Sequence, residues 1–368
     1  MTLRWMEGFE IRQAAVLQRE TYGVSNGSHV GNTPGSFPGR KQGTSANIGG
    51  LDFSTFISPQ LVGAVTNTWT VQWAFQKTSR TSYGAGNPLI NFYDQANGLQ
   101  MQFKIVDGTR AGTWAVEAFR GATSLGKTKD YAWGARGDTW VVFQATVVIR
   151  TGTNGSINLK TWDYYNNVTA NELNLTLINT ADQGSDGIDQ VGWGMDGGSR
   201  FDDIIVMDDA GSINNAQTST PLLVFGQLPI GDPGSTDWIP SSGVNHYDRV
   251  DSSSTSTTHD LTEVSSDTVT DHDQFSMQSV TQMSNAGTPP IIGTQIDIHG
   301  AMKNSGSRQV RVNIDDPAGG NADVATSLTF SDLVVTARTL ILETNPVSTV
   351  AWTLVDLEDH YVGIKLHA

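Results

Sequence analysis

The sequence predicts an all-β protein made of two antiparallel β-sandwiches in tandem. Apolar and polar residues alternate in short segments such as 69–75, which is the period of a strand with one buried face. Turn-forming pairs such as Asp107-Gly108 separate these segments at short intervals. One polar, Gly/Ser/Asn-rich stretch interrupts the pattern and predicts a first domain (residues 1–210), a linker (211–220) and a second domain (221–368).

The first domain is expected to open with a strand around residues 7–11 and a short helical stretch over 14–20. A Gly/Ser/Asn/Pro-rich loop over 23–50 follows, and loops of this length usually bind or pack against something. The remaining strands are expected at 69–75, 88–93, 99–105, 114–120, 140–149, 157–165, 190–194 and 201–207. Six tryptophans fall mostly in these strands and are expected to pack in the core: Trp69, Trp73, Trp114, Trp140, Trp162 and Trp193.

The second domain is expected to begin with a strand over 219–225, followed by segments at 236–243 and 245–250. The Ser/Thr/Asp-rich stretch 251–274 is interpreted as an exposed loop, because strand patterning resumes after it. Further strands are expected at 291–298, 309–314, 327–330, 333–342 and 361–366.

Composition excludes several classes of protein. Without cysteine there is neither a disulfide framework nor a thiolate metal site. No apolar run is long enough to span a bilayer, and the first ten residues lack the apolar core of a signal peptide. We therefore expect synthesis in a cytoplasm without Sec export, and no membrane insertion.

The charge of −15 is uneven: residues 1–210 carry 16 basic and 19 acidic groups, whereas residues 211–368 carry 6 and 18. Such an acidic surface repels phosphates, so no nucleic-acid partner is expected. The acidity either serves solubility or provides a loop that binds a divalent cation such as calcium.

The densest acidic cluster lies around the last predicted strand of the first domain: Asp196, Asp202, Asp203, Asp208 and Asp209. Neighbours on a strand point to opposite faces, so Asp202 and Asp203 cannot serve one site without a bulge. Local turn chemistry explains Asp208 and Asp209, and the alternative is a calcium site that uses these two residues with Asp196.

No catalytic set is apparent, so a non-enzymatic protein is expected. A retaining glycosidase would need paired carboxylates, as in an E-x-D-x-E strand, and neither Glu117 nor Glu172 has an acidic residue two positions on. His259 and His272 lie among acidic residues and are interpreted as solvated loop residues rather than metal ligands. There is no Gly-x-Ser-x-Gly motif and no Walker loop.

Two segments are candidate contact sites. Trp133, in Tyr-Ala-Trp-Gly, is the best candidate for an exposed platform that stacks on a sugar. Arg40 and Lys41, in the 23–50 loop, are candidates for contact with an acidic neighbour during assembly.

The first 210 residues resemble the concanavalin A-like (laminin G-like) jelly roll. The resemblance rests on Gly8-Phe-Glu10 in the opening strand, W-T-V-Q-W-A-F at 69–75, N-F-Y-D-Q-A-N-G at 91–98 and F-D-D-I-I-V at 201–206. It implies an N-terminal jelly-roll sandwich, a fold that commonly binds sugars.

Most of the chain also resembles a class of tailed-bacteriophage virion proteins. The matching segments are residues 201–207, G-Q-L-P-I-G-D at 226–232, W-I-P-S-S-G at 238–243 and N-P-V-S-T-V-A-W-T at 345–353.

The phage resemblance implies a structural component of the virion, such as a capsid decoration, a head fibre or a minor tail protein. Its expected partners are other virion proteins and further copies of itself. The alternative is a carbohydrate-binding adhesion module that attaches the particle to host surface glycans. A glycoside hydrolase comes third, because the carboxylate pair is missing.

Overall fold

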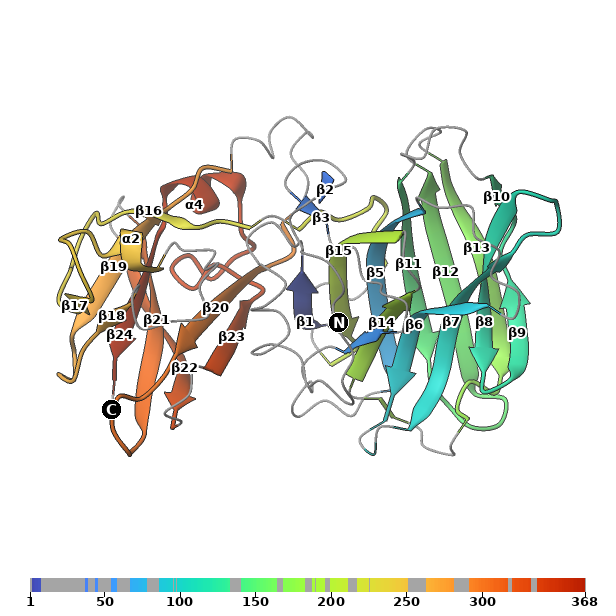
Figure 1. Ribbon diagram of the computed structural model, residues 1–368, viewed down its shortest axis with the longest axis horizontal. Coiled ribbons are helices and arrows are strands. Elements are labelled where there is room, and N and C mark those ends of the chain that lie inside the picture. The colour runs from blue at the N-terminus through green and yellow to red at the C-terminus, as the bar shows by residue number, and fades with distance from the viewer. Residues whose placement is uncertain are drawn as a thin grey trace. The chain divides into compact units, whose positions relative to one another are not determined.

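The computed structural model describes residues 2–7, 37–38, 44–45, 54–57, 67–77, 86–94, 96, 98–132, 140–163, 168–182, 187–188, 190–195, 199–210, 217–224, 226–250, 263–280, 291–316, 320–331 and 336–367. Contacts divide the chain into two compact units, Met1–Val224 and Phe225–Ala368 (Figure 1). No helix among the described residues is long and apolar enough to cross a membrane.

The first unit contains a six-stranded antiparallel sheet. Its strands, in spatial order, are β1 (Thr2–Glu7), β15 (Ser199–Asp208), β5 (Thr68–Lys77), β11 (Trp140–Val148), β12 (Gly155–Asp163) and β13 (Val168–Ile178).

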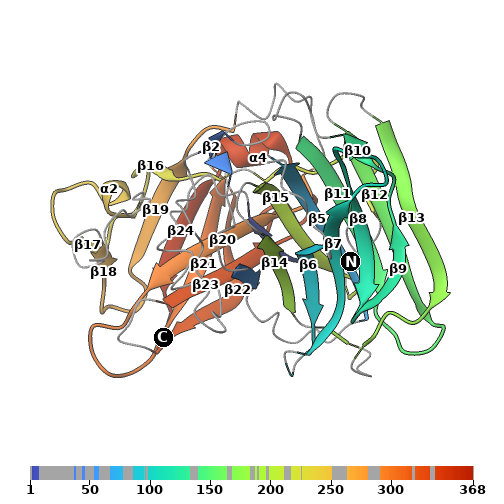
Figure 2. The same ribbon diagram turned by 45° about the vertical axis from the view of Figure 1, so that its right-hand side comes forward.

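A seven-stranded antiparallel sheet forms the second layer of this unit (Figure 2). Its order is β10 (Tyr131–Ala132), β8 (Thr113–Arg120), β7 (Leu99–Asp107), β6 (Asn87–Tyr93), β14 (Gln190–Met195) and β4 (Ser54–Ile57), with β9 (Thr123–Lys127) also paired to β8. A small ribbon pairs β2 (Phe37–Pro38) with β3 (Thr44–Ser45).

The core of the first unit lies between the two sheets. Trp69, Val71, Trp73 and Phe75 of β5 are all fully buried in it, as their alternation predicts. Ring stacking supports the packing: the centroid of Trp73 lies 5.2 Å from that of Phe143 on the neighbouring strand β11.

All six tryptophans are buried, as the sequence predicts, but they belong to two clusters. Trp114 and Trp193 belong to the main core, but Trp140 and Trp162 form a separate buried cluster with Ala74 and Val142. These four residues lie on the other face of the six-stranded sheet, because β11 and β12 point alternate residues to opposite sides.

The outer face of β5 is also buried, because residues 217–224 (hereafter the strap) are hydrogen-bonded along it. Gln72, which has no exposed surface, donates to the carbonyl of Leu222 at 3.0 Å and accepts from its N–H at 2.9 Å. Gln144 on β11 accepts from the N–H of Thr218 at 3.0 Å.

The strap therefore belongs to the first unit, which continues to Val224 instead of ending at residue 210. The strand expected at 219–225 is not formed in residues 219–224: the strap has no backbone ladder and is held by side chains. Of the expected 211–220 linker, residues 217–220 are part of the strap, and 211–216 lie outside the described residues.

A single carboxylate closes the turn between β7 and β8. One oxygen of Asp130 accepts from the N–H groups of Thr109 at 2.8 Å and Arg110 at 3.1 Å and from the hydroxyl of Thr113 at 3.2 Å. The hydroxyl of Thr109 also donates to it. These hydrogen bonds, that of the Thr109 hydroxyl first among them, lower the pKa of Asp130 to about 2.

The second unit is built on a five-stranded antiparallel sheet. Its order is β16 (Pro229–Gly231), β19 (His272–Met277), β24 (Tyr361–Leu366), β21 (Arg308–Asp316) and β22 (Gly320–Phe330). Two ribbons accompany it: β20 (Thr294–Gly300) pairs with β23 (Thr336–Leu342), and β17 (Ile239–Pro240) with β18 (Val264–Ser265).

One face of the five-stranded sheet packs into the core of the second unit. Val310, Val312 and Ile314 of β21 are buried there, with Leu340 of β23 and Trp352. Two short helices occur where none was expected: α2 (Tyr247–Val250) in the 245–250 segment, and α4 (Leu354–Asp359), which starts at a capping box of Thr353 and Asp356.

Candidate functional site

The acidic end of β15 is a structural element. Asp208 has no exposed surface and forms an ion pair with Arg4 on β1, with 2.6 Å between Oδ2 and Nε. Its other oxygen accepts from the N–H of Ala210 at 3.0 Å. Asp209 is exposed, and Asp196 lies outside the described residues.

The calcium interpretation of this cluster therefore gains no support, because Asp208 is occupied by Arg4. Among the residues that the structure describes, no three His, Cys, Asp or Glu side chains are grouped as metal ligands.

Asp202 and Asp203 lie at a β-bulge, where the register with β5 shifts before Ile205. Asp203 has a φ of 47°, in the left-handed region, and both carboxylates are buried. Asp202 accepts from the N–H of Asp203 at 2.9 Å, and Asp203 accepts from that of Val224 at 2.7 Å. The bulge thus directs a carboxylate to the end of the strap.

The glutamates considered above for a glycosidase lie on different sheets. Glu117, on β8, accepts from Ser124 at 2.5 Å, whereas Glu172, on β13, pairs with Lys129 at 2.8 Å. The hairpin motif at 91–98 is also structural, because Asp94 accepts from two N–H groups of its own turn and from Gln100.

The outer face of the seven-stranded sheet offers a different surface. Asn91, Gln102 and Phe119 are register partners on β6, β7 and β8, and all three point away from the core. In the next row Lys104 lies opposite Glu117, and its Nζ is 4.7 Å from the ring centroid of Phe119. We call these five residues the first-unit outer face.

Two amide oxygens beside this face are buried without a hydrogen-bond partner among the described residues: Oδ1 of Asn91 and Oε1 of Gln190. Gly192, next to Asn91 in the register, adds no side chain to the surface. Buried amide oxygens are normally satisfied, so these two are exceptions in this part of the sheet.

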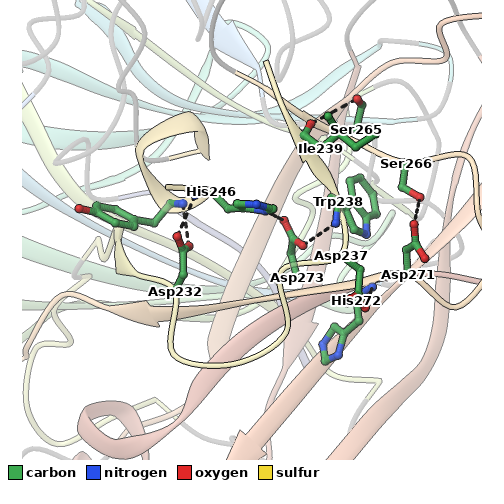
Figure 3. A network of polar contacts seen from close by, with 11 residues as sticks. Asp232, Asp237, Trp238, Ile239, His246, Ser265, Ser266, Asp271, His272 and Asp273 are labelled. Atoms are coloured by element: carbon green, nitrogen blue, oxygen red, sulfur yellow. Dashed lines mark hydrogen bonds and ion pairs between the residues drawn. The ribbon is translucent and has the colours of Figure 1, made fainter. Parts of the chain in front are cut away.

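In the second unit, motif residues converge on a buried histidine–carboxylate pair (Figure 3). Nδ1 of His246 lies 2.7 Å from Oδ2 of Asp273, and both side chains are almost fully buried. The other oxygen of Asp273 accepts from the N–H of Trp238 at 2.9 Å. Asp232 accepts from the N–H groups of His246 and Tyr247, each at 2.8 Å, and so fixes the start of α2.

This network explains two of the sequence motifs. The G-D at the end of 226–232 supplies Asp232, and the W-x-P-S-x-G segment supplies the N–H of Trp238. Among the histidines, the acidic neighbours of His259 and His272 drew attention to those two and not to His246. The local signal that could have identified His246 was its position at the start of the short 245–250 segment, just after the W-x-P-S-x-G motif.

The C-terminal motif at 345–353 is likewise structural. Asn345 closes its own turn, donating to the carbonyl of Val350 at 2.9 Å and accepting from the N–H of Val347 at 2.8 Å. Its amide nitrogen also lies 3.1 Å from Nε2 of His360, and the indole of Trp352 donates to the carbonyl of Leu342 at 3.0 Å. The motif joins β23 to α4.

The remaining predicted site residues fall into two groups. His272 is half-buried on β19 and so is not a solvated loop residue. Trp133, Arg40, Lys41 and His259 lie outside the described residues.

Comparison with known proteins finds likeness at the level of fold. No family model matches the chain, and no curated protein does. A glycoside hydrolase family 131 catalytic domain from Coprinopsis cinerea is 13% identical, with 60% of this chain and 99% of that chain covered and a TM-score of 0.34. The alginate lyase Aly36B is 11% identical, covering 54% and 96% with a TM-score of 0.31.

CG-16, a homodimeric agglutinin from chicken liver, is 10% identical, covering 42% of this chain and 100% of its own with a TM-score of 0.24. The all-β class expected from the sequence is confirmed, and the first unit is a sandwich of a six-stranded and a seven-stranded antiparallel sheet.

Proposed function

We propose that this protein is a non-enzymatic structural component of a tailed phage particle that acts through contacts with other virion proteins and with further copies of itself. The observation that supports the proposal is the structural role of the motifs that resemble those of phage virion proteins. Asp232, Trp238, Asn345 and Trp352 all make hydrogen bonds that hold the second unit together. Motifs that build a scaffold suit a protein whose task is assembly.

Arg40 and Lys41 in the 23–50 loop remain the predicted contact with an acidic neighbour.

The test is the composition of purified particles. Density-gradient-purified virions from cells that express the gene should contain this chain at fixed stoichiometry by mass spectrometry, and antibody labelling should place it on the particle in micrographs. A deletion of residues 26–46 should fold but be incorporated less. A chain that is absent from purified particles would refute the proposal.

A second candidate function is carbohydrate binding at the first-unit outer face. It is favoured by the row of Asn91, Gln102 and Phe119 across three neighbouring strands, with the ammonium of Lys104 over the ring of Phe119. Rings that stack on sugars and amides that bond hydroxyls are the usual parts of such sites. In a glycan array, Phe119→Ala and Lys104→Ala should reduce binding, and Trp133→Ala tests the platform expected from the sequence. Binding that survives all three substitutions would exclude this surface.

A further inference from the structure

The five-stranded sheet of the second unit has two chemically opposite faces. One packs into the apolar core, and the other carries polar side chains in register across β19, β24 and β21. His272 lies opposite Lys365, which lies opposite Arg311. Two positions along, Gln274 and Asn313 flank Gly363 in the same way. We call this surface, with Tyr361 in the next row, the second-unit polar face.

Hydrogen bonds within the face hold its side chains in place. Asn313 donates to Asp323 at 2.7 Å, and Lys365 reaches the other oxygen of Asp323 at 3.1 Å. Gln274 donates to Asp315 at 2.9 Å. Asn313 and Gln274 are only 2% and 7% exposed. Their amide groups are therefore held in one orientation, unlike side chains that move freely in solvent.

Two features are unusual for a face whose only role is solvation. Arg311 and Lys365 are cross-strand partners of like charge, an arrangement that destabilises a sheet. Nε2 of His272 is buried with no hydrogen-bond partner among the described residues. It lies over Gly363, where an added Cβ would collide with it, so the glycine lets the imidazole lie close to the sheet.

The charges of the face nearly balance. Burial lowers the pKa of His272, and the positive charge of Lys365 adds to the effect against the opposing charges of nearby carboxylates, so the imidazole is neutral at neutral pH. Partial burial alone would raise the pKa of Asp323, but hydrogen bonds from Asn313 and Lys365 outweigh it and hold that pKa below its usual value. The carboxylates of Asp323 and Asp315, with Asp237 at the N–H of His272, therefore slightly outnumber the cations Arg311 and Lys365.

A nearly neutral surface of fixed donors and acceptors suits a ligand rich in hydroxyl groups. The Nε of Arg311 already donates to the hydroxyl of Ser327 at 3.1 Å. Unused hydrogen-bonding capacity remains on the two terminal nitrogens of Arg311, on the ammonium of Lys365 and on the hydroxyl of Tyr361. Neighbouring strands lie about 4.8 Å apart, and successive residues on the same face of one strand lie about 6.8 Å apart. A surface of three strands and two such residues on each strand therefore has the dimensions of one or two sugar rings.

We propose that the second-unit polar face binds a neutral saccharide. The site is separate from the first-unit outer face and does not depend on it. Because a virion component could carry both, the experiment must distinguish the two surfaces.

The test uses the full chain on an array of neutral, amino and acidic glycans, followed by calorimetric titration with the strongest neutral binder. Arg311→Gln should weaken binding by about tenfold or more, because charge-assisted hydrogen bonds are the stronger ones. Tyr361→Phe removes one hydroxyl and should weaken binding by about three- to tenfold while leaving the fold intact. Arg308→Gln, an exposed change on the same strand β21, is the matched control and should bind like wild type.

Lys104→Ala, in the first unit, separates the two surfaces. Binding lost in Arg311→Gln and Tyr361→Phe but kept in Lys104→Ala supports the proposal. The proposal is overturned if the wild type binds no glycan, if it binds only acidic ones, or if only Lys104→Ala loses binding. Should Arg311→Gln unfold, as judged by circular dichroism, Tyr361→Phe decides.

Discussion

Replacing Gln72 with alanine should destabilise the first unit by releasing the strap. The side chain has no exposed surface and makes three hydrogen bonds: two with the backbone of Leu222, at 2.9 and 3.0 Å, and one to the carbonyl of Asp203 at 3.3 Å. Removing it leaves the buried N–H and C=O of Leu222 without these partners. At about 1 kcal/mol net for each bond, and about 1–3 kcal/mol for a buried group left unpaired, the expected loss is about 2–4 kcal/mol.

Thermal unfolding followed by tryptophan fluorescence measures this loss, because eight of the ten tryptophans precede residue 225. For a unit of this size, the expected fall in Tm is about 5–15 °C. Gln72→Met keeps most of the volume and should lose nearly as much stability, which separates hydrogen bonding from packing. Asn174→Ala, at an exposed amide on β13 of the same sheet, is the control and should change the free energy of unfolding by less than about 0.5 kcal/mol.

The double variant Gln72→Ala/Gln144→Ala tests whether the strap acts as one element. Both side chains hold the same segment, so the second substitution should add less than its effect alone. Unchanged Tm values for both Gln72→Ala and Gln72→Met would refute the reasoning and would mean that the strap is not part of the first unit.

Charged groups give three further expected outcomes. Hydrogen bonds lower the pKa of Asp130 from 3.8, the value in the unfolded chain, to about 2 in the folded protein. The stabilisation that its carboxylate provides is therefore present above the unfolded-state pKa and is lost as the pH falls through the folded-state pKa. Asp130→Asn should therefore be less stable than wild type at pH 6, with a gap in Tm that narrows from about pH 4 to pH 2; a constant gap would contradict this. His246→Ala should cost about 3–5 kcal/mol in urea unfolding of the second unit, because it leaves the buried carboxylate of Asp273 unpaired, and normal hydrogen-exchange protection of β19 would argue against it. Arg4→Met should cost less, about 1–3 kcal/mol, because the guanidinium that pairs with Asp208 is 25% exposed; a stability equal to that of wild type would show that the pair contributes nothing.

Much of the first unit could be predicted because its strands have a period that the sequence shows directly. The alternation of Trp69, Val71, Trp73 and Phe75 matches the buried face of β5. The same alternation could not show that the opposite face of β5 is covered as well, or that Trp140 packs there. Which element covers a face is decided by segments distant in the chain, and their approach leaves no local pattern.

The candidate sites were predicted less well. From the sequence, a calcium site at the end of β15 was the alternative to turn chemistry, and nothing local showed that Arg4, about two hundred residues earlier, pairs with Asp208. Sequence reasoning noted that Asp202 and Asp203 would need a bulge to act together, but not that the bulge serves the strap. It recorded the segment that contains His246 without recognising that its partner would be Asp273.

By itself, the sequence determined the all-β class, the core face of the central strand and the acidity of the second half, because these follow from local alternation, turn residues and counted charges. The tertiary structure alone decided that the first unit ends at Val224, that motif residues meet at His246 and Asp273, and that a polar face gathers around Gly363. The physical reason is range: alternation acts between residues two apart, whereas Gln72 and Leu222 are 150 residues apart and meet only when the chain folds.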